Sequence, residues 1–350
     1  MRRNSWLVLL SVFAGFPFQG SSIAAERPLP NVLLIYVDDM GYNDLSCYGA
    51  EDPGIKTPHI DRFAAEGLRF SNYLSACSVC SPSRGALLTG RYPPRNGLPV
   101  CPNDKPEQTD WHEHVGLPQS EITIAELLKP LGYATAAYGK WHLGEADKFA
   151  PRKQGFDEYI GRKHNFHVGK PGVWFHNEEP QGEILFREAH QKLTDATIAF
   201  MKQQRANEKP FFIYLAHYLV HGPWSPNKEF CTPDEWASVQ KLKGRMNPTA
   251  LPAMVRELDH HVGLVLASLK ELNIEKETLV IFASDNGPWL PAGSAHPLSG
   301  GKYTTMEGGH RVPAIISWPD RIPVGQVSDQ LVSALDVLPT ISTATGASLP

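Results

Sequence analysis

Apolar runs of strand length alternate with helical patterns along this 350-residue chain. The apolar runs are Asn31–Val37, Tyr133–Tyr138, Phe211–Ala216, Leu279–Ala283 and Pro313–Ser317. Helical periodicity occupies Ile60–Glu66, Ile122–Leu131, Leu193–Gln204, Leu251–Leu272 and Gln330–Thr345. Continuous apolar strands separated by helices are typical of parallel sheets that are covered on both sides. The pattern therefore predicts an α/β fold, with a mostly parallel (mixed) central sheet and helices on both faces.

Polar side chains follow four of these strands at the point where each strand ends. They are Asp38 and Asp39 after the first run, Lys140 and His142 after the second, His217 and His221 after the third, and Asp285 and Asn286 after the fourth. Alone, each has an ordinary explanation as a turn former or a solvated side chain. In open α/β sheets, however, ligands bind beyond the carboxyl ends of the strands. Together these residues predict a site at one edge of the sheet.

The residue types indicate what such a site would bind. Asp38, Asp39, Asp285 and Asn286 offer only oxygen ligands, which suit a hard divalent cation such as Ca²⁺ or Mg²⁺ and not zinc. Three carboxylates without a cation would repel one another and take up protons. Basic side chains are expected around them, namely Arg84, Lys140, His142, His221 and Lys302. A metal ion with such neighbours is suited to a tetrahedral oxyanion ester.

The stretch Cys80–Gly90 reads CSPSRGALLTG. By itself it predicts a turn that enters a helix, with Pro82 at an early helical position and Gly90 at the end. Such a turn places residue 80 beside free backbone N–H groups at the positive end of the helix dipole. Cys77 and Cys80 also form a C-x-x-C pair, but no second pair accompanies it to complete a zinc site. The pattern C-x-P-S-R followed by L-T-G resembles the signature in which sulfatases oxidise the cysteine to Cα-formylglycine.

Other stretches resemble the sulfatase family in the same order, across about residues 30–345. They read PNVLLIYVDDMGYNDLSCYG, GKWHLG, GFDEYIG, FASDNG and GKYTTMEGGHRVPAII, and are most similar to the arylsulfatase A and N-acetylgalactosamine-6-sulfatase branch. The resemblance implies an alkaline-phosphatase-like fold and the hydrolysis of sulfate esters. It implies one calcium ion bound by Asp38, Asp39, Asp285, Asn286 and the modified Cys80. It also implies that Arg84, Lys140, His142, His221 and Lys302 are catalytic or bind sulfate.

The aldehyde suggests the course of the reaction. Once hydrated, it presents two hydroxyls: one attacks sulfur with the help of Ca²⁺ and Arg84, and the second then expels the sulfate. The remaining basic side chains are expected to assist. Lys140 and Lys302 would neutralise the sulfate oxygens, and His142 would assist the chemistry of the aldehyde's hydroxyls. His221 would protonate the leaving oxygen.

Two questions stay open at this point. His217 lies four residues before His221, and His221 is preferred as the acid because the family's histidine lies just before a proline. The natural ester could be an aryl, steroid or carbohydrate sulfate, with carbohydrate favoured by similarity to the branch alone. Trp224 and Trp289 follow site motifs and could line a sugar subsite.

An export signal is expected at residues 1–25, with a basic start at Arg2 and Arg3, an apolar run at Trp6–Phe18 and small residues before the cleavage site. Its removal changes the formal charge from −4 to −6, so nucleic acid is not an expected partner. No later stretch is long and apolar enough to span a membrane. Pro248 blocks the Asn247 glycosylation motif. A secreted or periplasmic bacterial enzyme, matured by a formylglycine-generating enzyme, is therefore expected.

Residues 26–350 are expected to form the sulfatase catalytic α/β domain. Sulfatases of this type continue past the equivalent of Leu335–Thr340 into a smaller carboxyl-terminal subdomain, which is expected to be absent or truncated here. Two alternatives stay open: a metal-dependent phosphatase or phosphodiesterase of the same superfamily, and an inactive module that binds sulfated glycans. The sequence decides neither the oligomeric state nor the disulfide pairing of Cys47, Cys77, Cys101 and Cys231.

Overall fold

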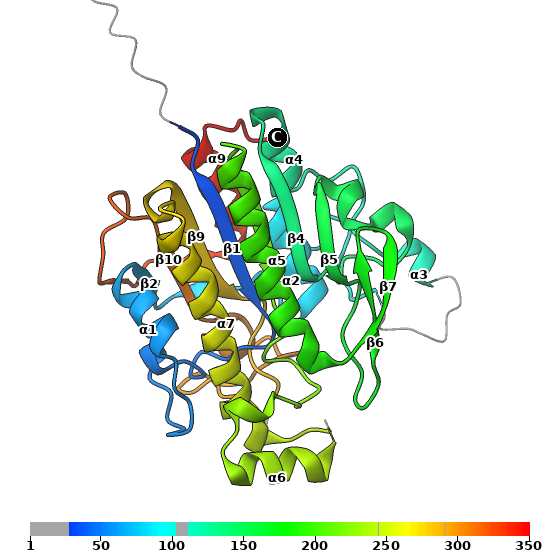
Figure 1. The fold of residues 1–350 in the computed structure, drawn as a ribbon, viewed down its shortest axis with the longest axis vertical. Helices are drawn as coiled ribbons and strands as arrows, with labels where there is room; N and C mark the ends of the chain where they lie inside the picture. Colours follow the sequence, from blue (N-terminus) through cyan, green and yellow to red (C-terminus); the bar gives the residue numbers. More distant parts are fainter. Residues whose placement is uncertain (1–27, 103–110, 244, 291) are drawn as a thin grey trace, which may run out of the picture.

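One ten-stranded sheet forms the centre of the molecule. The computed structural model describes residues 28–102, 111–243, 245–290 and 292–350, so the expected export signal at residues 1–25 lies outside the described residues. The strand order is β11-β2-β10-β9-β1-β8-β4-β5-β6-β7 (Figure 1). Five neighbouring strands are parallel: β9 (Thr278–Ser284), β1 (Asn31–Val37), β8 (Phe211–Ala216), β4 (Ala134–Lys140) and β5 (Glu158–Arg162).

The two edges of the sheet make it mixed. β10 (Ala314–Ser317) runs antiparallel to both β9 and β2 (Leu68–Phe70), while β11 (Gln326–Ser328) runs parallel to β2. At the opposite edge, β6 (Gly172–His176) and β7 (Glu179–Ile184) form an antiparallel hairpin beside β5. The predicted fold class is therefore confirmed.

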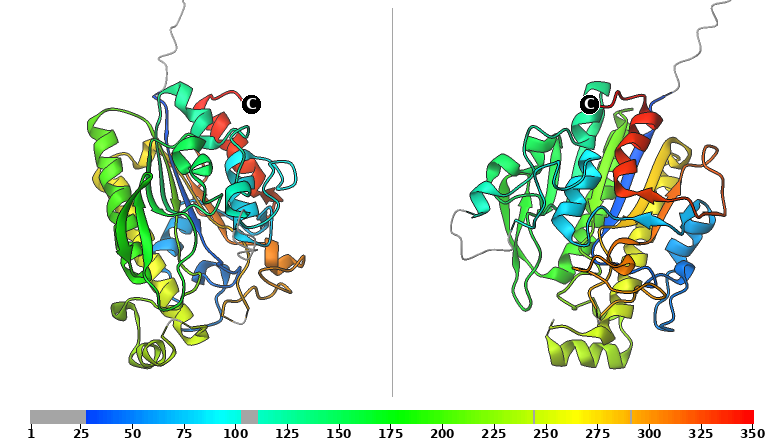
Figure 2. Two further views of the ribbon diagram at one scale, coloured as in Figure 1. Left: turned by 90° about the vertical axis from the view of Figure 1, so that its right-hand side faces the viewer. Right: turned by 180° about the vertical axis from the view of Figure 1, so that it is seen from behind.

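Helices cover both faces of the sheet (Figures 1 and 2). On one face lie α1 (Pro58–Ala65), α5 (Phe186–Ala206) and α7 (Leu251–Glu271), and on the other lie α2 (Cys80–Thr89), α4 (Ile124–Leu128) and α9 (Val337–Thr345). Successive side chains of β1 alternate between the two cores, since Leu33 and Ile35 belong to one and Leu34 and Tyr36 to the other. β1 is buried on both sides, which explains its continuous apolar sequence.

Several smaller elements complete the fold. The helix α6 (Pro233–Leu242) lies beyond one end of α7 (Figure 1). The remaining ones are α3 (Trp111–His114), α8 (Glu307–His310) and a separate pair of short parallel strands, β3 (Tyr73–Leu74) and β12 (Val332–Ser333). None of the helices in the described ranges has the length and hydropathy that a membrane span requires. No disulfide joins Cys47, Cys77 and Cys231, as far as the described residues go.

The prediction of a helix over Gln330–Thr345 was wrong for the first half of that range. Val332–Ser333 pairs as a strand, and only Val337–Thr345 is α-helical. The local cause is Ser333, whose hydroxyl accepts a hydrogen bond from the Leu335 N–H at 3.2 Å. Asp336 in turn accepts from the Ser333 N–H at 2.7 Å. These two bonds close a capping box, which starts a helical turn after Ser333 and so excludes the preceding residues.

Candidate active site

Three central strands deliver charged residues to one place. β1 and β9 are parallel neighbours with Val37 opposite Ser284, so Asp38 and Asp285 leave the sheet at the same level. The Asp39 N–H donates a hydrogen bond to Asp285 Oδ1 at 3.1 Å. Lys140, the last residue of β4, lies with its Nζ 2.7 Å from Asp38 Oδ2. Four of the strand-end residues that the sequence singled out, Asp38, Asp39, Lys140 and Asp285, thus lie in one cluster.

The buried helix α2 brings a cysteine and an arginine into this cluster. It begins at Cys80 after the extended residue Val79 and ends at Thr89, and the capping residue Gly90 has the left-handed φ of 66° expected after a helix. Cys80 Sγ lies 3.5 Å from Asp38 Oδ1 and 3.3 Å from Lys302 Nζ. Arg84, one turn further along α2, donates from Nε and Nη2 to Asp285 Oδ2 at 2.9 and 2.7 Å.

Each of the three carboxylates has a basic partner. Asp38 pairs with Lys140, Asp285 pairs with Arg84, and Lys302 Nζ lies 2.6 Å from Asp39 Oδ1. These side chains are at least nine-tenths buried. The mutual repulsion expected from the sequence is therefore offset in part by the protein's own cations, which the sequence argument had placed only around the site.

Burial and neighbouring charges set the protonation of the cluster. Burial raises the pKa of Asp285 to about 6, even though the Arg84 charge opposes the shift. Burial also acts to raise the pKa of Asp38, but the charges of Lys140, His221 and Arg84 outweigh it and hold that pKa well below its usual value. Burial raises the pKa of the Cys80 thiol well above its ordinary value, against the charges of Lys140 and Lys302. As a thiol, Cys80 would be a poor nucleophile here, because the thiolate is the reactive form.

The cluster has the donor set of a hard cation site. Ligand atoms of Asp38, Asp39, Cys80 and Asp285 all lie within 4.8 Å of one another. Asn286 Nδ2 donates to Asp39 Oδ1 at 2.7 Å, while its Oδ1 is buried and has no hydrogen-bond partner in the described part of the chain. A buried carbonyl oxygen without a partner is costly. The residues therefore fit an oxygen-coordinated ion such as Ca²⁺, which would use that orphaned oxygen.

Two of these residues adopt backbone conformations that are uncommon outside glycine. Asp39 has φ of 59° and His142 has φ of 57°. Left-handed non-glycine residues cluster at functional sites, where the surrounding structure holds them. Gly139 precedes Lys140 because a Cβ there would lie 1.9 Å from the Ala216 carbonyl oxygen on β8. His142 is buried, and burial together with the Lys140 and Arg84 charges lowers its pKa well below the usual value.

The two candidate acids have different surroundings. His221 Nε2 lies 3.7 Å from Asp39 Oδ2 and 3.5 Å from Asn165 Nδ2, while its Nδ1 donates to the Gly222 carbonyl at 2.6 Å. His217 instead points into the core, where its Nδ1 accepts the Leu219 N–H at 3.1 Å. The structure thus brings His221, and not His217, to the carboxylate cluster.

One contact of the site was missed altogether. Arg84 Nη1 donates to the Tyr214 hydroxyl at 3.3 Å, and Tyr214 is a buried residue of β8. Its aromatic side chain fits the apolar strand pattern, so no sequence signal separates it from the core.

Behind His217 lies a buried network that fixes the segment after His221. His190 Nδ1 lies 2.8 Å from Glu257 Oε1, and Asn227 donates to Glu257 from its N–H at 2.9 Å and from Nδ2 at 2.7 Å. His261 completes this second group of possible metal ligands. Because both oxygens of Glu257 already accept hydrogen bonds, we assign the group a structural role.

The Glu257 network gives a first prediction. Glu257→Gln should lower the free energy of unfolding by about 1–3 kcal/mol, because a donor amide would face the Asn227 donors in a buried site. Urea denaturation of the variant measures this change. Glu271→Gln, at the exposed end of the same helix, is the matched control and should be neutral. Equal stability of the two variants would contradict the structural assignment.

A cavity of about 470 Å³ opens beside His221. Its lining includes Trp224 and Trp289, whose ring centroids are 5.4 Å apart, and Arg245. We call it the tryptophan cavity. Its position means that any ester held at the carboxylate cluster and extending past His221 would contact aromatic rings.

Comparisons with known proteins agree with this geometry. The family model described as Sulfatase matches residues 30–347. The chain is similar to N-acetylgalactosamine-6-sulfatase of Canis lupus familiaris (38% identity, covering 99% of this chain and 67% of the relative) and to arylsulfatase A of Homo sapiens (37%, 98% and 68%). It therefore spans about two thirds of the length of these relatives. The crystal structure of Ps i-CgsB in complex with k-i-k-neocarrahexaose superposes with a TM-score of 0.80 at 31% identity, over 92% of this chain and 73% of that one.

Proposed function

The chain belongs to the sulfatase family of sulfuric ester hydrolases, and on that premise we propose that it hydrolyses carbohydrate sulfates through a formylglycine at position 80 and one calcium ion. The observation that carries the proposal is the placement of Cys80. It starts a fully buried helix, in contact with Asp38 and Lys302, in a cluster that fits a hard cation. A buried neutral thiol would not perform the reaction, whereas an aldehyde hydrate at the same point would.

The calcium ion and the hydrated aldehyde, when present, would supply charge neutralisation at the sulfate and a hydroxyl nucleophile. The protein's own residues would do the rest. Asp38, Asp39, Asp285 and Asn286 would hold the ion beside residue 80. Lys140 and Lys302 already lie in the cluster and would neutralise sulfate oxygens, while Arg84 would support the hydroxyl at residue 80.

The two histidines would have separate duties. His142, neutral and two residues after Lys140 in the chain, would move a proton at the residue 80 hydroxyls. His221 lies at the mouth of the site, where the leaving oxygen would emerge, and its Nε2 would deliver the proton. The tryptophan cavity would receive the sugar. Export to the periplasm or the medium, and maturation by a formylglycine-generating enzyme, form part of the same proposal.

The phosphatase alternative would require a second set of metal ligands beside the first. In the described residues the other candidate group is His190, Glu257 and His261, and its carboxylate is already used by His190 and Asn227. Parallel assays of the purified protein with nitrophenyl sulfate, nitrophenyl phosphate and bis-nitrophenyl phosphate separate these activities. We expect sulfate ester hydrolysis to dominate, and dominant phosphate ester hydrolysis would overturn the proposal.

His221 supplies a second prediction. A general acid matters most when the leaving alkoxide is a strong base. His221→Ala should therefore lose roughly two to four orders of magnitude in kcat/KM on a sugar sulfate while retaining much of its activity on nitrophenyl sulfate. His142→Ala should slow the hydrolysis of both substrates by similar factors, because proton transfer at the residue 80 hydroxyls is needed for each of them. If His221→Ala lost kcat/KM equally on the two substrates and His217→Gln lost it only on the sugar sulfate, His217 would be the general acid.

A further inference from the structure

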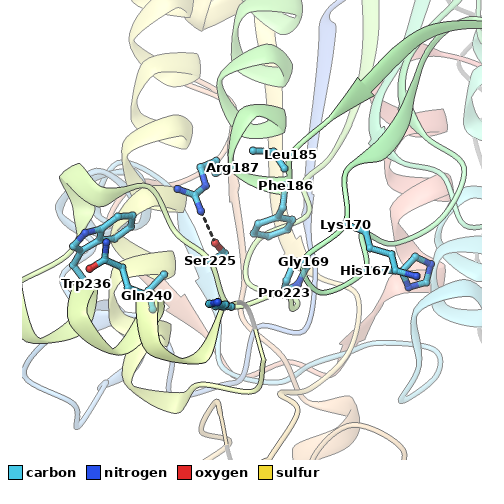
Figure 3. A pocket seen from close by; sticks show the side chains of 12 residues that line it. His167, Gly169, Lys170, Leu185, Phe186, Arg187, Pro223, Ser225, Trp236 and Gln240 are labelled. Atoms are coloured by element: carbon cyan, nitrogen blue, oxygen red, sulfur yellow. Dashed lines mark hydrogen bonds between the residues drawn. The ribbon is translucent and has the colours of Figure 1, made fainter.

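A second cavity of about 360 Å³ lies next to the tryptophan cavity, between the start of α5 and α6. We call it the arginine cavity. Arg187 and Phe186 of α5 and Trp236 of α6 line it, together with Ser225 and Pro223 (Figure 3). The two cavities share Pro223 and His167 in their linings. A ligand that passes from the carboxylate cluster over His221 and through the tryptophan cavity would therefore reach the arginine cavity next.

The lining of the arginine cavity is positively charged. Lys170, Arg187 and Lys243 contribute cations, and none of the described residues that line it is acidic. Lys170 and Lys243 are exposed, whereas Arg187 is half-buried. The acid nearest to Arg187 along the chain, Glu188, accepts the Leu185 N–H at 2.7 Å and does not line the cavity.

Arg187 is held in place by neutral groups. Its Nη2 donates to Ser225 Oγ at 3.1 Å, and its guanidinium lies 5.8 Å from the centroid of the Trp236 ring. Figure 3 shows Arg187 reaching toward Ser225, with Trp236 on one side and Phe186 and Pro223 on the other. The contacts of the Arg187 guanidinium with described residues are thus with a hydroxyl and an aromatic ring, so it keeps donors and charge for a ligand. A fixed arginine of this kind recognises sulfate or carboxylate by paired hydrogen bonds.

We propose that the arginine cavity is a subsite for a second anionic group, sulfate or carboxylate, on an acidic oligosaccharide whose scissile sulfate lies at residue 80. This inference rests on the proposed function and makes it more specific: the substrate is an extended, multiply charged glycan and not a simple monosaccharide sulfate. Arg187 binds that group directly, and Lys170 and Lys243 add attraction from the rim.

The test compares two substrates in the full-length, matured enzyme. One is nitrophenyl sulfate, which has no second anion, and the other is a chondroitin 6-sulfate tetrasaccharide. We expect Arg187→Ala to lower the ratio of kcat/KM for the tetrasaccharide to kcat/KM for nitrophenyl sulfate about tenfold, mainly through KM. Arg187→Lys, which keeps the charge but not the paired donors, should recover only part of that ratio. Lys192→Ala, an exposed cation further along α5, is the control and should leave it unchanged.

A carboxyl-reduced tetrasaccharide identifies the bound group. If it still shows the Arg187 effect, the second anion is a sulfate, and if the effect disappears, it is a carboxylate. An unchanged ratio in Arg187→Ala with normal nitrophenyl sulfate turnover would overturn the subsite and leave the proposed function standing. If no variant or wild-type protein hydrolyses either sulfate, calorimetric titration with the tetrasaccharide decides: weaker binding by Arg187→Ala supports the subsite, and equal binding overturns it.

Discussion

Cys80→Ala is expected to abolish sulfate ester hydrolysis, with a fall in kcat of roughly four orders of magnitude or more. The reason is geometric and chemical. Cys80 Sγ is in contact with Asp38 and Lys302 at the start of a buried helix, so its side chain is placed to attack an ester held there. Steady-state kinetics with nitrophenyl sulfate measure the loss, and circular dichroism checks that the variant is folded.

Cys77→Ala is the matched control for this variant. Cys77 lies three residues earlier and is only partly buried, and its backbone carbonyl accepts a hydrogen bond from Ser75 Oγ. Its thiol is not part of the carboxylate cluster, so the variant should retain activity within about twofold. Loss of activity in Cys77→Ala together with normal turnover in Cys80→Ala would show that the nucleophile is Cys77 and not Cys80.

Asp285→Asn should lower kcat/KM by roughly three orders of magnitude or more and remove stoichiometric calcium from the purified protein. Asp285 is the residue where the ion site and the basic groups meet, since its Oδ1 accepts the Asp39 N–H and its Oδ2 accepts two bonds from Arg84. The substitution also removes the charge of the carboxylate nearest to the buried Arg84, at 2.7 Å, and leaves Asp38 at 3.7 Å as the next one. The free energy of unfolding should therefore fall by about 3 kcal/mol.

Two controls separate these effects. Unfolding is measured in the presence of a chelator, so that the loss from the broken ion pair is not confused with the loss of bound metal. Asp259→Asn removes another buried carboxylate, which accepts the N–H groups of His59 and Ile60 at the start of α1. It should destabilise the protein without changing its calcium content. Full calcium occupancy in Asp285→Asn, or stoichiometric zinc in the wild type, would contradict the ion site.

The sequence predicted the centre of the molecule well and its edges poorly. The strands β1, β8, β9 and β4 are buried on both faces, so their apolar runs are unmistakable, and parallel pairing brings their carboxyl ends together. β7 is exposed along nearly all of its length and has a polar sequence, so nothing in the chain distinguishes it from a loop. The hairpin of β6 and β7 was missed for that reason.

The site shows a similar limit. Residue types and strand ends were enough to place Asp38, Asp285 and Lys140 in one region, because the backbone alone brings them there. The specific pairing of each carboxylate with one cation depends on the arrangement of side chains, and so does the turn that directs His221 toward Asp39 and His217 into the core. Sequence periodicity carries no information on either. The arginine cavity is also invisible in the sequence, because α5, α6 and the loop with Ser225 meet only in the fold.

Mass spectrometry of the tryptic peptide Phe70–Arg84 tests the central claim most directly. The protein is produced together with a formylglycine-generating enzyme, and the peptide is analysed alongside the specific activity of the same sample. We predict that residue 80 carries the aldehyde, that Cys77 remains a thiol, and that activity across preparations is proportional to the fraction converted. Full sulfatase activity in a sample whose Cys80 is entirely unmodified would contradict the account.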